Sequence, residues 1–225
     1  MSFSTVEIVF QIIAFLFAIS VHESAHAWTA FRRGDPTAYM LGRVTLNPIK
    51  HINLIGTVLL PIIAAISHFP LIGWAKPTPV NPRNFKRPVL DDILTSVAGP
   101  VSNFIVVVSS VMLMLLIGKT SDLGNAVVRG LAHGTLVDAG VLTPVVFLLY
   151  EFMYINILLG IFNLIPVPPL DGSHVLRHFL SGTALRAYDQ LGMFGLIILM
   201  LVGGRVLGFF MYPVVGFFQG ILKSV

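Results

Sequence analysis

The sequence predicts an all-α polytopic membrane protein, a bundle of about four to six transmembrane helices in a single domain over residues 1–225. Hydrophobic residues make up 56% of the chain and charged residues only 11%, and the mean hydropathy is +0.88. The 14 basic and 10 acidic side chains are too few to cover the surface of a soluble core of this size. These values disfavour both a soluble enzyme and a nucleic-acid-binding protein.

Long apolar runs are a further observation that predicts a bundle of transmembrane helices. They cover about residues 5–31, 52–72, 93–117, 140–165 and 190–222. The first four approach or exceed the roughly 20 residues that a spanning helix requires. Gly56, Pro61 and Pro70 break the run 52–72, which therefore predicts either a re-entrant segment or a span with an extended return. Pro213 interrupts the last run, which predicts one long tilted helix or two shorter ones.

The charges predict how the chain is oriented in the membrane. Eight of the fourteen Lys and Arg residues lie between residues 32 and 92, in the net-positive stretches 32–51 and 73–92. The stretch 118–139 has no net charge. Because basic loops stay on the cytoplasmic side, we expect a multi-pass plasma-membrane protein with 118–139 outside. Since the chain has no Cys, any chemistry must use His, carboxylates, hydroxyls or amides.

An HExxH motif, His22-Glu23-Ser24-Ala25-His26, stands at the end of the first run. In a helix its two imidazoles project from the same face about 5 to 6 Å apart, a spacing that suits two ligands of one zinc ion. Glu23 is rotated off that face and can act as a general base toward a zinc-bound water. The alternative is a satisfied polar patch, which is costly for three ionisable groups inside an apolar run.

A third ligand has to come from another part of the chain, because catalytic zinc usually takes three protein ligands. The stretch Asn163–Gly172 contains three prolines that cannot continue a helix, and Asp171 follows them directly. Irregular backbone at membrane depth is tolerated only inside protein or beside a water-filled cavity. The other interpretation is that the prolines simply end a helix and that Asp171 with Gly172 forms an interfacial turn.

A third constellation is Gly99-Pro100-x-x-Asn103, near the start of the run 93–117. Pro is well placed in the first turn of a helix, and Gly allows another backbone to approach closely. Asn103 is a bare amide inside an apolar segment. On these residues alone, helix packing through Asn103 hydrogen bonds is the preferred interpretation.

In this order, the motifs at 22–26, 99–103 and 163–172 resemble the site-2 protease family of intramembrane zinc metalloproteases, peptidase family M50. The stretches Gly73-Trp74-Ala75-Lys76-Pro77 and Asn47-Pro48 resemble its compact bacterial and archaeal members, which lack PDZ and CBS domains. The likeness covers about residues 10–180.

The resemblance implies one Zn²⁺ per chain, held by His22, His26 and Asp171. It also implies that Glu23 is the catalytic acid and base and that the amide of Asn163 lies near the oxyanion. For Gly99, Pro100 and Asn103 it implies a substrate-binding or structural role near the site. The final run after residue 190 matches no functional motif.

The stretch 73–82 predicts a short extended or β segment near that site, because Pro77 and Pro79 block only one edge of a strand. The other edge would present the N–H groups of Lys76, Thr78 and Val80 to an unwound substrate segment. Thr78 is therefore a candidate substrate-binding residue. An interfacial polyproline segment anchored by Trp74 is the alternative.

Together these observations predict a zinc endopeptidase that cleaves within or near a transmembrane segment of a membrane-protein substrate in the bilayer, with no nucleic acid as partner. One rival is a di-iron oxygenase or desaturase, because His174 and His178 form a second HxxxH pair. A non-enzymatic metal transporter is another. His51, His68 and His133 lie at segment edges and are expected at the membrane interface.

Overall fold

The computed structural model describes residues 3–59, 63 and 75–225, and their regular structure is helical, with no β-strand among them. Within the described residues, four stretches are long and apolar enough to cross a membrane: Val6–Arg33 in α1 (Phe3–Arg33), α4 (Pro88–Thr120), α6 (Leu142–Leu164) and Gly204–Lys223 in α8 (Gly182–Lys223). The predicted all-α polytopic fold is thereby confirmed.

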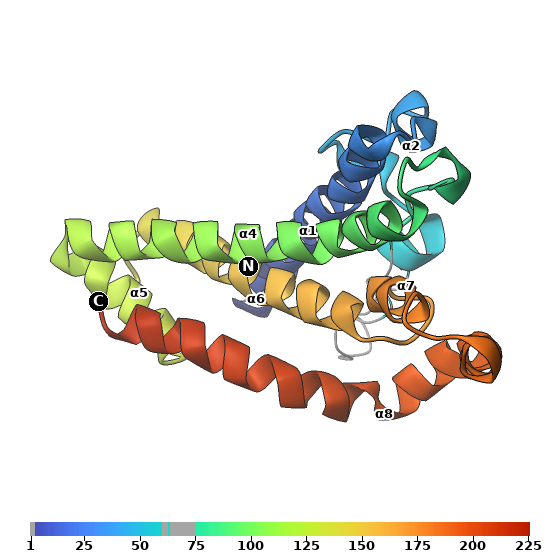
Figure 1. Cartoon of the computed structure of the whole chain (residues 1–225). Coiled ribbons are helices and arrows are strands. Elements are labelled where there is room, and N and C mark those ends of the chain that lie inside the picture. The colour runs from blue at the N-terminus through green and yellow to red at the C-terminus, as the bar shows by residue number, and fades with distance from the viewer. Residues whose placement is uncertain (1–2, 60–62, 64–74) are drawn as a thin grey trace.

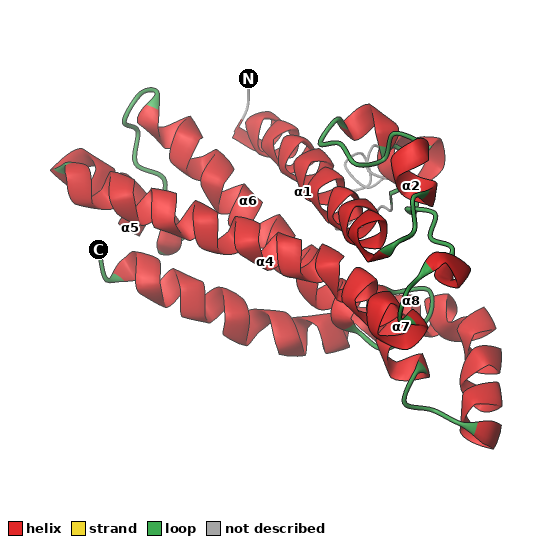
Figure 2. Cartoon of the chain, turned by 45° about the horizontal axis from the view of Figure 1, so that its top comes forward, coloured by secondary structure: helices red, strands yellow, loops and turns green. Residues whose placement is uncertain are grey.

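Helix α4 packs against both α1 and α6, and these three helices form the centre of the bundle (Figures 1 and 2). The largest core cluster joins the fully buried Val107 and Met114 of α4 to Met153 and Ile157 of α6. The second cluster includes two fully buried alanines of α1, Ala14 and Ala18. Small residues let helix backbones approach closely, so α1 lies tightly against α6.

The two basic stretches lie at the same end of the bundle, beside the C-terminal end of α1 and the start of α4 (Figure 1). The carboxylate of Asp35 accepts hydrogen bonds from Asn81 N at 2.7 Å and from Asn84 Nδ2 at 2.8 Å. Lys86 N donates to Arg33 O at 3.4 Å. The short helices α2 (Thr37–Met40), η1 (Pro48–Lys50) and η3 (Pro82–Asn84) belong to these stretches. Segment 32–92 therefore begins and ends on one side, as its charges predict.

The start of one helix and the presence of another differ from the predictions. Helix α4 begins at Pro88, so Pro100 lies in its interior and not in its first turn. A spanning helix can continue beyond its apolar run into polar sequence, and α4 includes Asp91 and Asp92. The stretch 118–139 contains an amphipathic helix, α5 (Asp122–Ala132), whose N-terminus is capped by the Ser121 hydroxyl accepting from Gly124 N at 3.0 Å.

The last apolar run belongs to one helix, α8, which Figure 1 shows to be bent and which contains Pro213. In the run 52–72, Leu54–Leu59 form a π-helical segment, η2. Residues 60–62 and 64–72 of the predicted re-entrant segment, which include His68, lie outside the described residues, as does Trp74. Residues 75–81 have neither helix nor strand, so the predicted extended stretch forms no β ladder with the described part of the chain.

Candidate metal centre

Three side chains from two helices meet at the C-terminal half of α1. His22 and His26 lie one turn apart on α1, and Asp171 opens the short helix α7 (Asp171–Arg177). Asp171 Oδ2 lies 3.1 Å from His22 Nε2 and 3.3 Å from His26 Nε2. The two Nε2 atoms are 3.0 Å apart. Across residues 3–59, 63 and 75–225, no other group of three His, Cys, Asp or Glu side chains brings its ligand atoms this close together.

The proline-rich segment after α6 turns Asp171 back toward α1. Helix α6 ends at Leu164, and α7 begins seven positions later. A side chain at Gly172 would place its Cβ 2.8 Å from Ile165 O and closer still to Leu164 O, so only glycine allows α7 to pack this tightly on the end of α6. Tyr188 Oη donates to Pro166 O at 2.9 Å and anchors the segment to α8.

Gly99 lets α4 pass directly beside the two imidazoles. A Cβ at this position would lie 2.5 Å from His22 Cε1, 2.7 Å from His22 Nε2, and closer still to His26 Nε2. Real Cβ atoms essentially never show contacts under 3.0 Å, so any larger residue would have to displace the histidines. Ser102 Oγ donates to Gly99 O at 2.6 Å within the same turn.

Each imidazole is held from behind through its Nδ1 atom. His26 Nδ1 lies 2.7 Å from Thr95 O, and His22 Nδ1 lies 2.7 Å from Asn103 Oδ1. Both Nδ1–H groups therefore donate to α4, and both Nε2 atoms are left facing Asp171. Asn103 is fully buried behind His22 and joins α1 to α4, which fits the helix-packing interpretation of this residue.

Glu23 is held by Thr78. Its Oε2 accepts the Thr78 backbone N–H at 2.8 Å and the Thr78 hydroxyl at 2.7 Å. Lys76 N donates to His51 O at 2.8 Å. Two of the three N–H groups expected on an open strand edge are thus already used inside the chain, and the sequence gives no signal for this because Thr78 and Glu23 are far apart in it.

Three other predicted polar residues have hydrogen-bond partners outside the cluster. Asn163, in the last turn of α6, donates one N–H to Leu159 O at 3.0 Å. His178 Nε2 lies 2.7 Å from Asp92 Oδ2, so this histidine pairs with α4 and does not join His22 and His26. His51 is fully buried, with Nε2 2.8 Å from Thr45 O, because loop 43–51 folds over α1.

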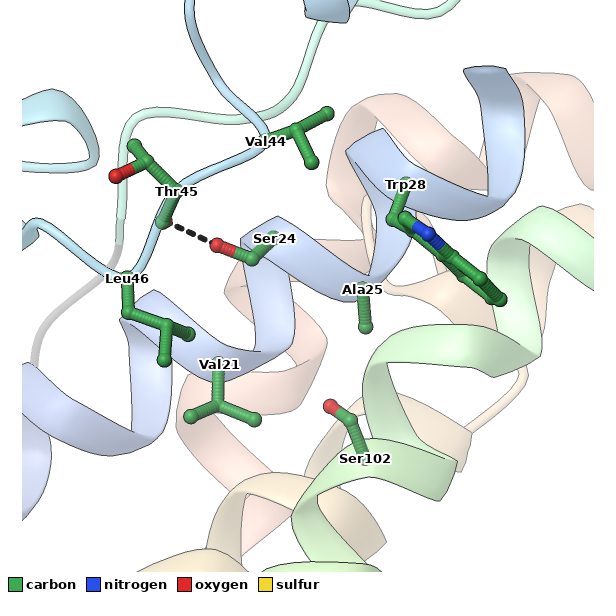
Figure 3. A pocket seen from close by; sticks show the side chains of 8 residues that line it. All are labelled: Val21, Ser24, Ala25, Trp28, Val44, Thr45, Leu46 and Ser102. Atoms are coloured by element: carbon green, nitrogen blue, oxygen red, sulfur yellow. Dashed lines mark hydrogen bonds between the residues drawn. The ribbon is translucent and has the colours of Figure 1, made fainter. Parts of the chain in front are cut away.

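An open hollow of about 320 Å³ lies along the neighbouring face of α1 (Figure 3). It is lined by Val21, Ser24, Ala25 and Trp28 of α1, by Val44, Thr45 and Leu46 of the following loop, and by Ser102 of α4. The Ser24 hydroxyl donates to Thr45 O and ties the loop to the HExxH turn. The hollow is almost wholly apolar and contains none of the three clustered ligand atoms.

The three converging side chains fit a catalytic zinc ion. Asp171 Oδ2 is buried, yet it accepts no hydrogen bond, because the nearby Nε2 atoms present lone pairs rather than N–H groups. A deprotonated carboxylate with two neutral imidazoles is a known catalytic zinc donor set that leaves one position open.

Comparison with known proteins agrees with this donor set. The chain matches peptidase family M50 over residues 10–202. It is 33% identical over 199 residues to "Putative zinc metalloprotease YwhC" of Bacillus subtilis (strain 168), across 88% of this chain and 82% of that protein. It is 28% identical over 192 residues to "Putative zinc metalloprotease Rip2" of Mycolicibacterium smegmatis, across 85% of this chain and 65% of the relative.

Rip2 of Mycobacterium tuberculosis (strain ATCC 25618 / H37Rv) is 29% identical over 195 residues, across 86% of this chain and 66% of that protein. No solved structure matches the chain. The family match covers most of α1, all of α4 and α6, and all three clustered residues. The chain therefore belongs to peptidase family M50 and is a multi-pass membrane zinc metalloprotease of the site-2 type.

Proposed function

We infer that the protein hydrolyses a peptide bond within or near a transmembrane segment of another membrane protein. One observation carries this proposal: two of the three clustered residues and the general base lie on α1, which is itself a candidate span. His22, Glu23 and His26 are 6%, 9% and 7% exposed, enclosed by other helices of the bundle. A scissile bond that reaches them has to enter among transmembrane helices.

The metal-binding residues in this proposal are His22 and His26, through their Nε2 atoms, and Asp171, through its carboxylate. When bound, zinc would act as a Lewis acid on the scissile carbonyl and lower the pKa of the attacking water toward neutrality. Thr95 and Asn103 keep the two imidazoles turned toward the metal position.

Glu23 is the proposed proton carrier. It accepts the proton of the attacking water and returns it to the leaving amine. Both hydrogen bonds from Thr78 reach Oε2, so Oε1 is the oxygen that takes the proton. Thr78 therefore positions the carboxylate, and an unwound substrate segment that added to the 75–81 stretch would have to leave this contact in place.

Asn163 is the proposed oxyanion donor. One N–H of its amide is used by Leu159 O, and the second N–H can donate to the oxygen of a tetrahedral centre. Loss of such a donor costs about 3 to 4 kcal/mol in other enzymes.

We place the site on the cytoplasmic side of the plasma membrane. The basic stretches 32–51 and 73–92 meet at the end of the bundle where α1 ends, close to the metal cluster. Because positively charged loops stay in the cytoplasm, this end should face inward.

Co-expression tests the function. The protein is expressed with a panel of single-span membrane proteins, and mass spectrometry compares their fragments with those from a Glu23→Gln strain. Fragments ending within or next to the span, present only with the wild type, are the expected result. Identical fragments in both strains, or cleavage confined to soluble domains, would contradict it.

A further inference from the structure

Two buried amides connect His22 to α6. Asn103 Oδ1 lies 2.7 Å from His22 Nδ1, and Asn103 Nδ2 donates to Asn156 Oδ1 at 2.7 Å. Asn156 Nδ2 in turn donates to Phe152 O at 2.8 Å. Both amides are fully buried, so no solvent competes for these bonds. Asn156 and Asn103 are called the amide relay below.

The direction of the relay is fixed by backbone carbonyls. A carbonyl oxygen can only accept, so Phe152 O requires the NH₂ end of Asn156 and turns its oxygen toward Asn103. That oxygen requires the NH₂ end of Asn103, which leaves Asn103 Oδ1 facing His22. Ala18 O, 3.4 Å from Asn103 Nδ2, favours the same orientation.

The orientation of Asn103 decides which nitrogen of His22 carries the proton. An oxygen at 2.7 Å from Nδ1 requires an N–H there, and neutral imidazole then has its lone pair on Nε2. Nε2 is the atom that faces Asp171. His26 achieves the same result with a single bond from Nδ1–H to Thr95 O. His22 relies instead on a backbone carbonyl two amides away.

We propose that Asn156 is a positioning residue for the zinc site: by holding the Asn103 amide in one orientation, it selects the His22 tautomer that can bind metal. The hydrogen bonds of the Asn156 side chain go to Asn103 and Phe152, so Asn156 acts on the site through Asn103. The inference rests on the proposed role of His22 as a zinc ligand. Without Asn156, the Asn103 amide can turn over and present an N–H to Nδ1, which moves the proton of His22 to Nε2 and blocks the ligand atom.

A double-mutant cycle on zinc affinity tests the relay. The purified full-length protein in detergent is stripped of metal, and its affinity for zinc alone is measured by competition with a chelating dye. Asn156→Leu, which has nearly the same shape but no polar atoms, should weaken binding about tenfold or more, as loss of outer partners of metal-bound histidines does elsewhere. In the Asn103→Asp background the same substitution should change affinity by less than about twofold, because a carboxylate has no N–H to present to Nδ1.

Controls separate the relay from stability and from ligand identity. Gln219→Leu removes another amide bond onto α6, from Gln219 Nε2 to Tyr150 Oη, and should leave zinc affinity unchanged. Asn156→Asp should keep near-wild-type affinity, because a protonated carboxyl can donate to Phe152 O and accept from Asn103. This variant decides the matter if Asn156→Leu does not fold.

Three outcomes would overturn the relay: unchanged affinity in Asn156→Leu, equal losses in both backgrounds of the cycle, or a tenfold loss in folded Asn156→Asp. Full zinc affinity in His22→Ala, measured in parallel, would instead overturn the ligand assignment.

Discussion

Gly99 shows how one missing side chain makes room for a metal centre. Alanine stabilises an ordinary helix by about 1 kcal/mol relative to glycine. At Gly99, however, its Cβ would lie under 3.0 Å from atoms of both imidazoles. Gly99→Ala should therefore lose most of its zinc and its activity while the helix is retained. Gly220→Ala, in open space on α8, should keep both, and full metal content in purified Gly99→Ala would contradict the close approach.

We predict that Thr78 acts through its backbone N–H more than through its side chain. Thr78→Ala keeps the N–H that donates to Glu23 Oε2, whereas Thr78→Pro removes both the N–H and the hydroxyl. Flanking Pro77 and Pro79 already hold the stretch extended, so the added proline strains it little. Turnover of a membrane substrate at equal zinc content should fall strongly in Thr78→Pro and only slightly in Thr78→Ala. Equal activities would remove Thr78 from the site.

Sequence reasoning recovers residues joined by local spacing better than residues joined by distant contacts. His22 and His26 lie one helical turn apart, and motif order implied Asp171 as their partner; the structure brings the three together. Asn156 gives no such signal, since its link to His22 passes through Asn103 on another helix. Contacts of this kind are set by how α1, α4 and α6 pack.

At the scale of elements, Asp35 joins the end of α1 to the segment that leads into α4. It accepts from Thr37 as well as from Asn81 and Asn84. Burial alone would raise the pKa of Asp35, but these hydrogen bonds outweigh it and lower the pKa below its ordinary value. The charged carboxylate therefore stabilises the fold above the unfolded pKa of about 3.9, and this contribution is lost as pH falls through the lower folded value.

Asp35→Asn should consequently lower the free energy of unfolding by about 2 kcal/mol near pH 7, and the difference from wild type should shrink as pH falls below about 4. Thermal unfolding in detergent across this pH range measures it. Asp138→Asn, at an exposed aspartate of the opposite loop, is the matched control and should show no comparable difference. A deficit for Asp35→Asn that is the same at every pH would rule out the charge as its source.

The apolar runs predicted the spanning helices because a span must be continuously apolar. Helix α5 was not predicted, because its apolar residues do not form a continuous run. Val127, Val128 and Leu131 face the core, whereas Arg129 is exposed. The start of α4 was not predicted, because Asp91 was assigned to a polar loop, whereas it is a buried residue of the helix. Hydropathy marks the membrane-embedded part of a helix and not its ends.

At the scale of the whole molecule, one end carries both the metal cluster and most of the positive charge. Arg32 lies over the ring of Trp28 at 5.7 Å in the last turns of α1, a pairing typical of a membrane interface. We predict that this end faces the cytoplasm. In a chain without natural cysteines, Arg83→Cys and Ala126→Cys are exposed positions on opposite sides of the bundle.

A membrane-impermeant thiol reagent applied to intact cells should label Ala126→Cys, and Arg83→Cys only after the membrane is opened. Arg83 is preferred to its neighbour Asn84, whose side chain is bonded to Asp35. Labelling of both positions from outside would refute the single-sided placement of segment 32–92.

Metal content of purified protein tests the central claim most directly. Two histidines and one carboxylate complete a catalytic zinc site, so wild type and Glu23→Gln should each contain one zinc per chain, with activity abolished in Glu23→Gln. His22→Ala, His26→Ala and Asp171→Ala should lose the metal or bind it far more weakly. Two irons per chain in the wild type, or full zinc in Asp171→Ala, would contradict the account.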